Sequence, residues 1–397
     1  MSAPRRSGVG TPPSVVHVTE AMGAGVLQML AELSRGQADL GWDVEVVYSD
    51  RAETPAPGVL RDLFGPRVRL VRAGGHDRRR NLLALAVAAR AAMRARPAAV
   101  VHAHSTLAGL AVRAVTRRGD RWRVVYTPHG FAFLPLPARS LRQRGVLLAE
   151  RVLAARGAGV LAVGPAEAAW VTDAVGPAVP VVSVPNTVSR AVVEHRRAGP
   201  GPGPGSRDAS GRPLVLGVGR VTRQKAPWVF AAAARELASA ADFVWVGDGD
   251  PQDRARWLPR DVPVEVTGWL DHHEVLDLLG RARLLLMPSE WEGMPVTLME
   301  ACWVGVPAVV RDAPGMADVV VDGVNGVVAQ DDAAIVRETA DVLQDEARWA
   351  SLRDGCLATR DRFDPATYVS RVGRAYGALG VLGAQDVAAV HGRGRAL

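Results

Sequence analysis

The chain has 397 residues, of which 48% are hydrophobic and 22% charged, and its formal net charge is +7. A chain of this length can form two domains with separate cores. Its two cysteines are too few for a disulfide framework or a cysteine-based metal site, which favours a reducing compartment. The start of the chain lacks a hydrophobic signal core, and the apolar segment 82–93 is too short to span a bilayer. We therefore expect a cytoplasmic protein that is not an integral membrane protein.

The basic residues are distributed unusually, because Lys225 is the single lysine among 48 lysines and arginines. Arg and Lys are not interchangeable where a compact point charge is required, so Lys225 is a candidate functional residue. The arginines form either a dispersed, solvated surface or one that contacts an anionic membrane. The scattered aromatic residues form no stacking platform, so we expect no nucleic-acid partner.

Short apolar segments alternate with helical segments along the whole chain. In the first half the predicted strands are 14–18, 43–48, 99–102, 123–127, 159–163 and 181–184. In the second half they are 214–218, 243–246, 264–267, 284–287 and 308–310. This alternation predicts parallel sheets covered by helices on both faces, with ligands bound at the carboxyl ends of the strands.

A Gly-Pro repeat at 199–205 can form neither helix nor strand and marks a linker between the two halves. The predicted fold class is α/β, with two doubly wound, Rossmann-like domains facing a central cleft. The predicted segments are a disordered N-terminus (1–13), a first domain (14–195), a linker (196–212), a second domain (213–364), a C-terminal helix (365–381) and a mobile tail (382–397).

The segment 289–307 follows a predicted buried strand and carries two carboxylates around a helix start. Glu292 lies in the turn, Pro295 suits the first helical position, and Glu300 falls in the second helical turn. The free N–H groups and dipole of a helix start favour an anion, so the segment suits the phosphates and hydroxyls of a sugar nucleotide. A glycosidase would need both carboxylates across one bond, whereas this spacing covers about 12 Å of mostly helical chain. We therefore disfavour hydrolysis.

Other polar residues follow predicted strand ends. Gly219, Arg220 and Lys225 follow the strand 214–218, and the two cations can neutralise a diphosphate. The tripeptide Asp248-Gly249-Asp250 has the form of an Asp-x-Asp metal clamp, but turn chemistry accounts for it, so we expect no metal.

Several histidines also follow strand ends. His129, between Pro128 and Gly130, is a candidate functional residue. His102 and His104 lack a third metal ligand. We place His104 in the cleft lining on the acceptor side, and Asn186 falls just past another strand end.

The order strand–Gly219–Arg220–x4–Lys225, followed by Glu292-Gly-x-Pro-x3-Met-Glu300, resembles the retaining nucleotide-sugar glycosyltransferases of family 4, which have the GT-B fold. The resemblance covers nearly the whole ordered chain. Further support comes from Gly23-Ala24-Gly25, Pro128-His129-Gly130, Pro185-Asn186-Thr187, Gly247-Asp248-Gly249 and Asp322 to Gly326. One departure is that Lys225 precedes Ala226, where the family usually has glycine.

The resemblance implies roles for these residues. Arg220 and Lys225 would bind the donor diphosphate, Glu292 the sugar hydroxyls and Glu300 the ribose, while His129 would lie beside the transferring sugar. The implied catalytic set is His129, Arg220, Lys225 and Glu292. The implied donor-binding set is Gly23, Ala24, Gly25, Gly219, Arg220, Lys225, Gly247, Asp248, Gly249, Glu292, Gly293, Met294, Pro295, Val296 and Glu300. The acceptor-side set is His104 and Asn186, and the final helix would cross back to the first domain.

The implied activity is metal-independent transfer of a sugar, with retention, from a nucleotide-sugar donor that we expect to be UDP-linked. The acceptor would be a cell-envelope, exopolysaccharide or other glycan or lipid-linked molecule, reached at the inner face of a membrane. A nucleotide-sugar 2-epimerase of the same fold would need a dense set of acid/base residues that the sequence does not show. A non-catalytic nucleotide-sugar binding module is disfavoured by the complete charged set.

Overall fold

A computed structural model describes residues 12–51, 53–74, 78–134, 136–137, 139–197, 211–384 and 386–387. The predicted Gly-Pro linker 199–205 and most of the two predicted tails lie outside these residues. The chain divides into two units, one formed by residues 1–186 and 365–397 and the other by residues 187–364.

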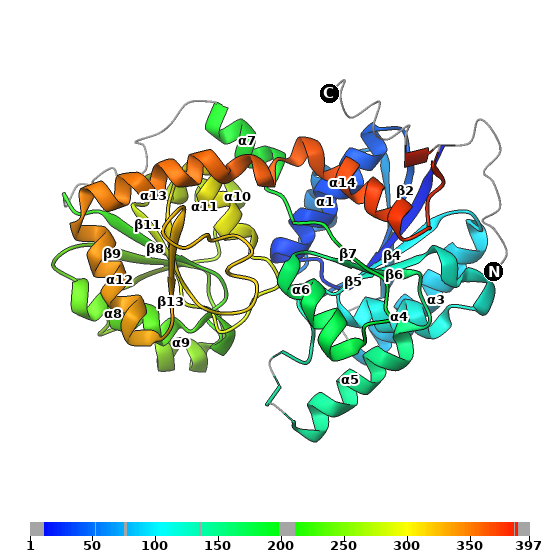
Figure 1. Cartoon of the computed structure of the whole chain (residues 1–397), viewed down its shortest axis with the longest axis horizontal. Helices are drawn as coiled ribbons and strands as arrows, with labels where there is room; N and C mark the ends of the chain where they lie inside the picture. The colour runs from blue at the N-terminus through cyan, green and yellow to red at the C-terminus, as the bar shows by residue number, and fades with distance from the viewer. Residues whose placement is uncertain are drawn as a thin grey trace. The chain divides into compact units, whose positions relative to one another are not determined.

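The first unit contains a parallel sheet with the strand order β3-β2-β1-β4-β5-β6-β7 among its described residues (Figure 1). Its strands are β1 (Ser14–Thr19), β2 (Asp43–Ser49), β3 (Val68–Gly74), β4 (Val100–His104), β5 (Val124–Thr127), β6 (Gly159–Ala162) and β7 (Val181–Ser183). Its helices are α1 (Ala24–Asp39), α2 (Pro57–Phe64), α3 (Arg78–Ala95), α4 (Thr106–Val115), α5 (Leu141–Ala154), α6 (Pro165–Trp170) and α14 (Pro365–Ala378).

The second unit contains another parallel sheet, with the order β10-β9-β8-β11-β12-β13 among the residues that the structure describes. Its strands are β8 (Leu214–Val218), β9 (Asp242–Val246), β10 (Glu265–Gly268), β11 (Leu284–Met287), β12 (Ala308–Arg311) and β13 (Gly326–Ala329). Its helices are α7 (Arg190–Arg197), α8 (Pro227–Leu237), α9 (Pro251–Trp257), α10 (His272–Arg281), α11 (Val296–Val304), α12 (Asp332–Gln344) and α13 (Glu346–Thr359).

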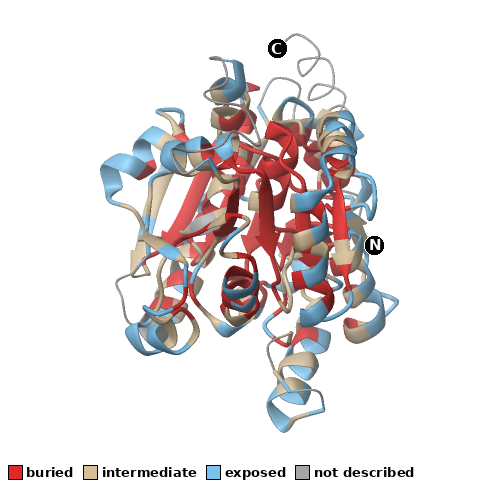
Figure 2. Ribbon diagram, turned by 90° about the vertical axis from the view of Figure 1, so that its left-hand side faces the viewer, coloured by how far each residue is buried: buried red, intermediate tan, exposed pale blue. Residues whose placement is uncertain are grey.

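The inner strands of both sheets are apolar and largely buried, as expected for parallel sheets covered on both faces, whereas the edge strands β3, β7 and β10 are partly exposed (Figure 2). The strand order reverses direction between β1 and β4 in the first unit and between β8 and β11 in the second. In such sheets the connections on either side of this switch point leave in opposite directions, which opens space for a ligand at the carboxyl ends. The predicted α/β class with two doubly wound halves is confirmed.

The helix α14 belongs to the first unit, as predicted for the final helix. It packs against α1 and β7, and its side chains Val372, Ala375 and Tyr376 join a core cluster that also contains Val15 and Trp42 (Figure 1). The first unit is therefore built from two segments of chain that are far apart in sequence.

The division between the units lies at residues 186 and 187, earlier than the predicted domain end at 195. The hydroxyl of Thr187 and the backbone N–H of Val188 both donate to the carbonyl of Phe363, at 2.6 and 3.1 Å. Arg196, in α7, donates to the carbonyl of Val304 at 3.0 Å. These bonds fasten residues 187–197 to the second unit, and 196–197 are helix instead of linker.

Two further features concern helices. The chain from Asp332 to Thr359 forms two helices, α12 and α13, because Asp345 between them has an extended backbone and its carboxylate accepts from the N–H of Arg348 as the N-cap of α13. Within the described residues, no helix combines the length and apolar character needed to cross a membrane.

We predict that Gly355→Ala will destabilise the second unit. A Cβ at residue 355, inside α13, would overlap the backbone carbonyl oxygen of Val324. Relief requires movement of backbone, so the loss in free energy of unfolding should be about 1–3 kcal/mol in urea denaturation. Gly280→Ala is the matched control, because its helical position is open and the change should be neutral or stabilising. Equal stability of the two variants would contradict the close approach.

Candidate active site

The loops that follow β8 and β11 meet at the switch point of the second sheet. The Nζ atom of Lys225 lies 2.6 Å from Oε1 of Glu292, and the two side chains are 18% and 11% exposed. This pair joins two residues that the sequence analysis placed in the same site on separate loops. Its partial burial makes the geometry better defined than that of an exposed ion pair.

Backbone hydrogen bonds hold these two loops together. The N–H of Glu290 donates to the carbonyl of Gln224 at 2.8 Å, and the side-chain amide of Gln224 donates to the carbonyl of Trp291 at 2.9 Å. On the other side, the N–H of Glu292 donates to the carbonyl of Pro314 at 3.0 Å. The turn that carries Glu292 is therefore fixed from two directions.

Glycines allow the lysine stem to cross the end of β8. Gly219 has φ of +142°, and a Cβ there would lie 2.8 Å from Cε of Lys225. Gly247 has φ of +121°, and a Cβ there would overlap the carbonyl oxygen of Gly219. Only glycine adopts these conformations at low cost. Ala226, where the resembled family usually has glycine, adopts the left-handed region at φ of +47°.

The start of α11 lies beside this pair. The helix begins at Val296, with Pro295 as an extended N-cap residue, so Pro295 precedes the first helical position that the sequence predicts for it. No side chain caps the helix start. Arg220 is exposed, and among the described residues no carboxylate pairs with its guanidinium. A helix start and two nearby cations suit an anion.

Glu300 lies in the second turn of α11 and is 4% exposed. Nε2 of His272, at the start of α10, lies 2.8 Å from Oε1 of Glu300. The ring of His272 is 23% exposed and is held against this buried carboxylate. The partner of Glu300 was not identified from the sequence.

The two carboxylates of the Asp-x-Asp tripeptide have local partners. Oδ2 of Asp248 lies 3.1 Å from Nη1 of Arg254, and its Oδ1 accepts from the N–H of Gly249 at 2.9 Å. Oδ1 of Asp250 accepts from the N–H of Gln252 at 2.9 Å and caps α9. The interpretation of this segment as turn and cap chemistry agrees with these contacts.

In the first unit, His129 lies in the turn after β5, with φ of +53°. The left-handed region costs a non-glycine residue roughly 1–2 kcal/mol, so the surrounding structure must hold it there. Glu167, which is fully buried, accepts from the N–H of Gly130 at 2.7 Å and from that of Val163 at 2.9 Å. Glu167 thus fixes the histidine turn to the start of α6, a role that the sequence analysis missed.

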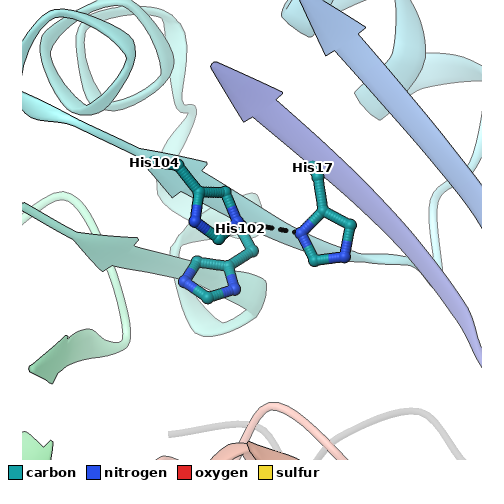
Figure 3. A group of neighbouring side chains, drawn as sticks. All are labelled: His17, His102 and His104. Atoms are coloured by element: carbon teal, nitrogen blue, oxygen red, sulfur yellow. Dashed lines mark hydrogen bonds between the residues drawn. The ribbon is translucent and has the colours of Figure 1, made fainter. Parts of the chain in front are cut away.

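His129 contacts a buried group of histidines. Its Nε2 lies 3.1 Å from Nδ1 of His104, and Nε2 of His104 lies 2.9 Å from Nδ1 of His17 (Figure 3). His102 packs beside them, with its ring centroid 4.0 Å from that of His104. The sequence places His104 in the cleft lining, but its side chain is buried, at 3% exposed. His129, which is partly exposed, lies between His104 and the surface and is bonded to it.

Burial keeps these imidazoles uncharged. It lowers the pKa of His17 and of His129 to about 4 and holds the pKa of His102 and of His104 well below the ordinary value. Mutual repulsion between the rings lowers the pKa of His102 and His104 further.

His17, His102 and His104 bring one nitrogen each to within 4.8 Å of one another, a spacing that a metal ion could bridge (Figure 3). His17 is the third histidine that the sequence analysis did not find. However, both ring nitrogens of His102 already lie at hydrogen-bond distance from hydroxyls, of Tyr376 at 2.8 Å and of Thr127 at 2.7 Å. Metal binding would therefore require these bonds to break.

The remaining predicted residues lie at other strand ends. Gly23 precedes α1, which begins at Ala24, and a Cβ at residue 23 would lie 2.7 Å from Cγ of Glu53. Asn186 is the last residue of the first unit before the division and is 4% exposed. Each belongs to the carboxyl edge of the first sheet.

Comparison with known families decides the family of this chain. Residues 23–191 match the model described as Glycosyltransferase Family 4, and residues 212–345 match Glycosyl transferases group 1. The chain belongs to glycosyltransferase family 4. The two matched regions fall in the two halves that the sequence predicts, and the family resemblance is confirmed.

Among curated relatives, a 41.2 kDa protein of the Klebsiella pneumoniae cps region is 26% identical, over 61% of this glycosyltransferase and 68% of the relative. Alpha-D-kanosaminyltransferase of Streptomyces kanamyceticus is 31% identical over 30% of this chain and 32% of the relative. The second alignment spans less than half of either protein.

Solved structures share the fold over 92% of this chain. Sucrose-phosphate synthase from Thermosynechococcus elongatus matches with a TM-score of 0.72 and 20% identity, covering 92% of this chain and 99% of that one. Anabaena HepE in complex with UDP-glucose matches with a TM-score of 0.71 and 15% identity over the same shares. The GT-B fold is thereby confirmed.

We predict that acid destabilises this glycosyltransferase through its buried histidines. The pKa of His17 is about 4 when folded, against an ordinary 6.5, so the folded state binds fewer protons between these values. The free energy of unfolding should therefore fall as pH drops from 6.5 towards 4, by up to about 1.4 kcal/mol per pH unit for each such histidine. Urea midpoints at pH 7, 6 and 5 measure this.

The variant His17→Gln should show a shallower dependence on pH, whereas the exposed control His273→Gln should keep the wild-type slope. A urea midpoint that stays constant from pH 7 to 5 would contradict the buried, neutral histidines.

Proposed function

We propose that this chain transfers a sugar, with retention of configuration, from a UDP-sugar to a cell-envelope or exopolysaccharide acceptor. The observation that carries the proposal is the Lys225–Glu292 pair beside the uncapped start of α11 at the second switch point. Support for the nucleotide comes from HepE, whose structures hold UDP and UDP-glucose. A further relative is an Escherichia coli galactosyltransferase named for UDP-Gal.

The leaving group in this reaction is a diphosphate, and its developing charge must be compensated. The ammonium of Lys225 carries three donors, so it can keep its bond to Glu292 and donate to phosphate oxygens as well. Arg220 would add a second cation, and the N–H groups at the start of α11 would add fixed dipoles. We propose that these groups serve the diphosphate without a metal ion.

The two glutamates would recognise hydroxyl groups. Glu292 is oriented by Lys225 and can accept from hydroxyls of the donor sugar. Glu300 is oriented by His272 and retains acceptor capacity for the ribose. Because neither carboxylate needs to attack carbon, both act by positioning the donor.

Lys225→Ala should lower kcat about 10²–10³-fold, because the diphosphate charge would go uncompensated. Lys225→Arg should recover only part of this loss, since a guanidinium is larger and planar. Turnover is measured as release of UDP, with a panel of UDP-, GDP- and dTDP-sugars, and binding by calorimetry. Arg260→Ala, an exposed change in the same unit, is the control.

Near-normal turnover of Lys225→Ala would overturn the assignment. Product analysis separates the alternatives. A glycosyltransferase would transfer the sugar to an acceptor, a 2-epimerase would isomerise the donor, and a binding module would leave the donor unchanged. Activity that is lost with a chelator and restored by Mg²⁺ or Mn²⁺ would overturn the metal-independent reaction.

The acceptor class rests on the relatives and on one surface of the first unit. Relatives include the cps-region protein of Klebsiella pneumoniae and a glycosyltransferase named for amylovoran biosynthesis. On α5, Leu141, Leu148 and Val152 are 85%, 62% and 59% exposed, and their spacing of seven and four places them on one helix face. The exposed arginines Arg142, Arg144 and Arg151 accompany them. We propose that this face binds an anionic bilayer that carries a lipid-linked acceptor.

We expect the chain to sediment with vesicles containing phosphatidylglycerol at low salt and not with purely zwitterionic vesicles. Leu141→Ser combined with Leu148→Ser should reduce the bound fraction about tenfold, because apolar insertion is lost. The control Val59→Ser alters an exposed apolar residue on α2 and should bind normally. Unchanged binding of the double variant would contradict this surface.

A further inference from the structure

His129 ends a continuous chain of buried side chains. Oε1 of Gln37, on α1, lies 2.8 Å from Nε2 of His17 on β1. Nδ1 of His17 lies 2.9 Å from Nε2 of His104 on β4, and Nδ1 of His104 lies 3.1 Å from Nε2 of His129. The chain of contacts therefore runs from α1 to the turn after β5; its central His17–His104 bond is drawn in Figure 3.

A second chain of contacts starts at β6 and ends at Tyr376 on α14. The hydroxyl of Thr127 donates to the carbonyl of Leu161 at 2.7 Å and lies 2.7 Å from Nε2 of His102. Nδ1 of His102 lies 2.8 Å from the hydroxyl of Tyr376.

The carbonyl of Leu161 determines the direction of every bond in this second chain, because a carbonyl can only accept. The Thr127 hydroxyl donates its single proton to the carbonyl of Leu161, so it can only accept from Nε2 of His102. A neutral imidazole has one donor and one acceptor, so Nδ1 of His102 accepts from Tyr376. His102 is thereby held as the Nε2–H tautomer beside His104.

The same reasoning applies to the first chain, from Gln37 to the surface. Oε1 of Gln37 is an amide oxygen and can only accept, so Nε2 of His17 donates to it. Nδ1 of His17 then accepts from Nε2 of His104, and Nδ1 of His104 accepts from Nε2 of His129. The low pKa values of these rings agree with the neutral forms that this order requires.

From this order we propose that the buried chain Gln37–His17–His104 fixes His129 as the Nε2–H tautomer, with an unprotonated Nδ1 that accepts from a sugar hydroxyl. Among the described residues, none bonds Nδ1 of His129, and the residue is partly exposed. Gln37, His17 and His104 are thus positioning residues that act through His129. The choice of a sugar hydroxyl rests on the proposed function, whereas the tautomer does not.

The test is the tautomer itself, read from two-bond ¹H–¹⁵N correlations of the full chain labelled with ¹⁵N-histidine at pH 7. His129 is assigned by the signals that disappear in His129→Asn. We expect Nδ1 of His129 to show the shift of an unprotonated nitrogen and Nε2 that of a protonated one. A protonated Nδ1, or a ring protonated on both nitrogens, would overturn the proposal.

Gln37→Leu tests the long-range order, because it removes the carbonyl that accepts from His17. We expect the two tautomers of His129 to become mixed, with kcat about fivefold lower and the calorimetric Kd for UDP unchanged. Tyr376→Phe is the matched control, because it removes a buried hydroxyl that bonds His102, and it should leave the tautomer of His129 unchanged. A wild-type His129 spectrum in Gln37→Leu would overturn the relay.

Two further outcomes separate the hypotheses. One equivalent of zinc in the purified chain, bound by His17, His102 and His104, would overturn the relay, because coordination would replace these hydrogen bonds. Failure to transfer any nucleotide-activated sugar, together with the expected tautomer, would overturn the proposed function and the sugar hydroxyl while leaving the order of the buried bonds in place.

Discussion

In both units, every described strand is parallel to its neighbours, so the carboxyl ends of the strands lie at one edge of each sheet. The loops that leave this edge are crowded, and their backbone N–H and C=O groups all need hydrogen-bond partners. The second unit satisfies them mainly with backbone contacts, which glycines at 219 and 247 make possible. The first unit uses buried carboxylates, since Glu20 accepts from Ser105 and from the N–H of Ala108, and Glu167 fixes the turn at Gly130. The carboxyl edges of the two sheets thus have different chemistry.

Under the function proposed above, that difference suits different parts of a sugar nucleotide. The carboxyl edge of the second sheet is charged. It carries Arg220, the Lys225–Glu292 pair, and Glu300, which contacts His272. The edge of the first unit presents a neutral imidazole supported by other neutral imidazoles. Charges are worth most against a diphosphate, whereas neutral acceptors recognise hydroxyls without the cost of desolvating an ion.

Much of the architecture followed from apolar periodicity, and Lys225, Glu292 and Glu300 were found because each follows a strand end or opens a helix. The residues that were missed are those whose partner is remote in sequence. A histidine inside an apolar strand, such as His17, is indistinguishable from a packed core residue until β1 and β4 are paired in register. His272 and Glu167 were missed for the same reason, since nothing local indicates which carboxylate or N–H group each will meet.

The helix α14 has a consequence for how the protein is made. The second unit is one continuous segment, whereas the first lacks Tyr368, Val372 and Tyr376 from its core until the last helix has been synthesised. On the ribosome, the second unit can complete its fold before the first, although it is translated later. His102 acquires its phenol partner only then, so the first unit completes its core only after the second unit has been synthesised.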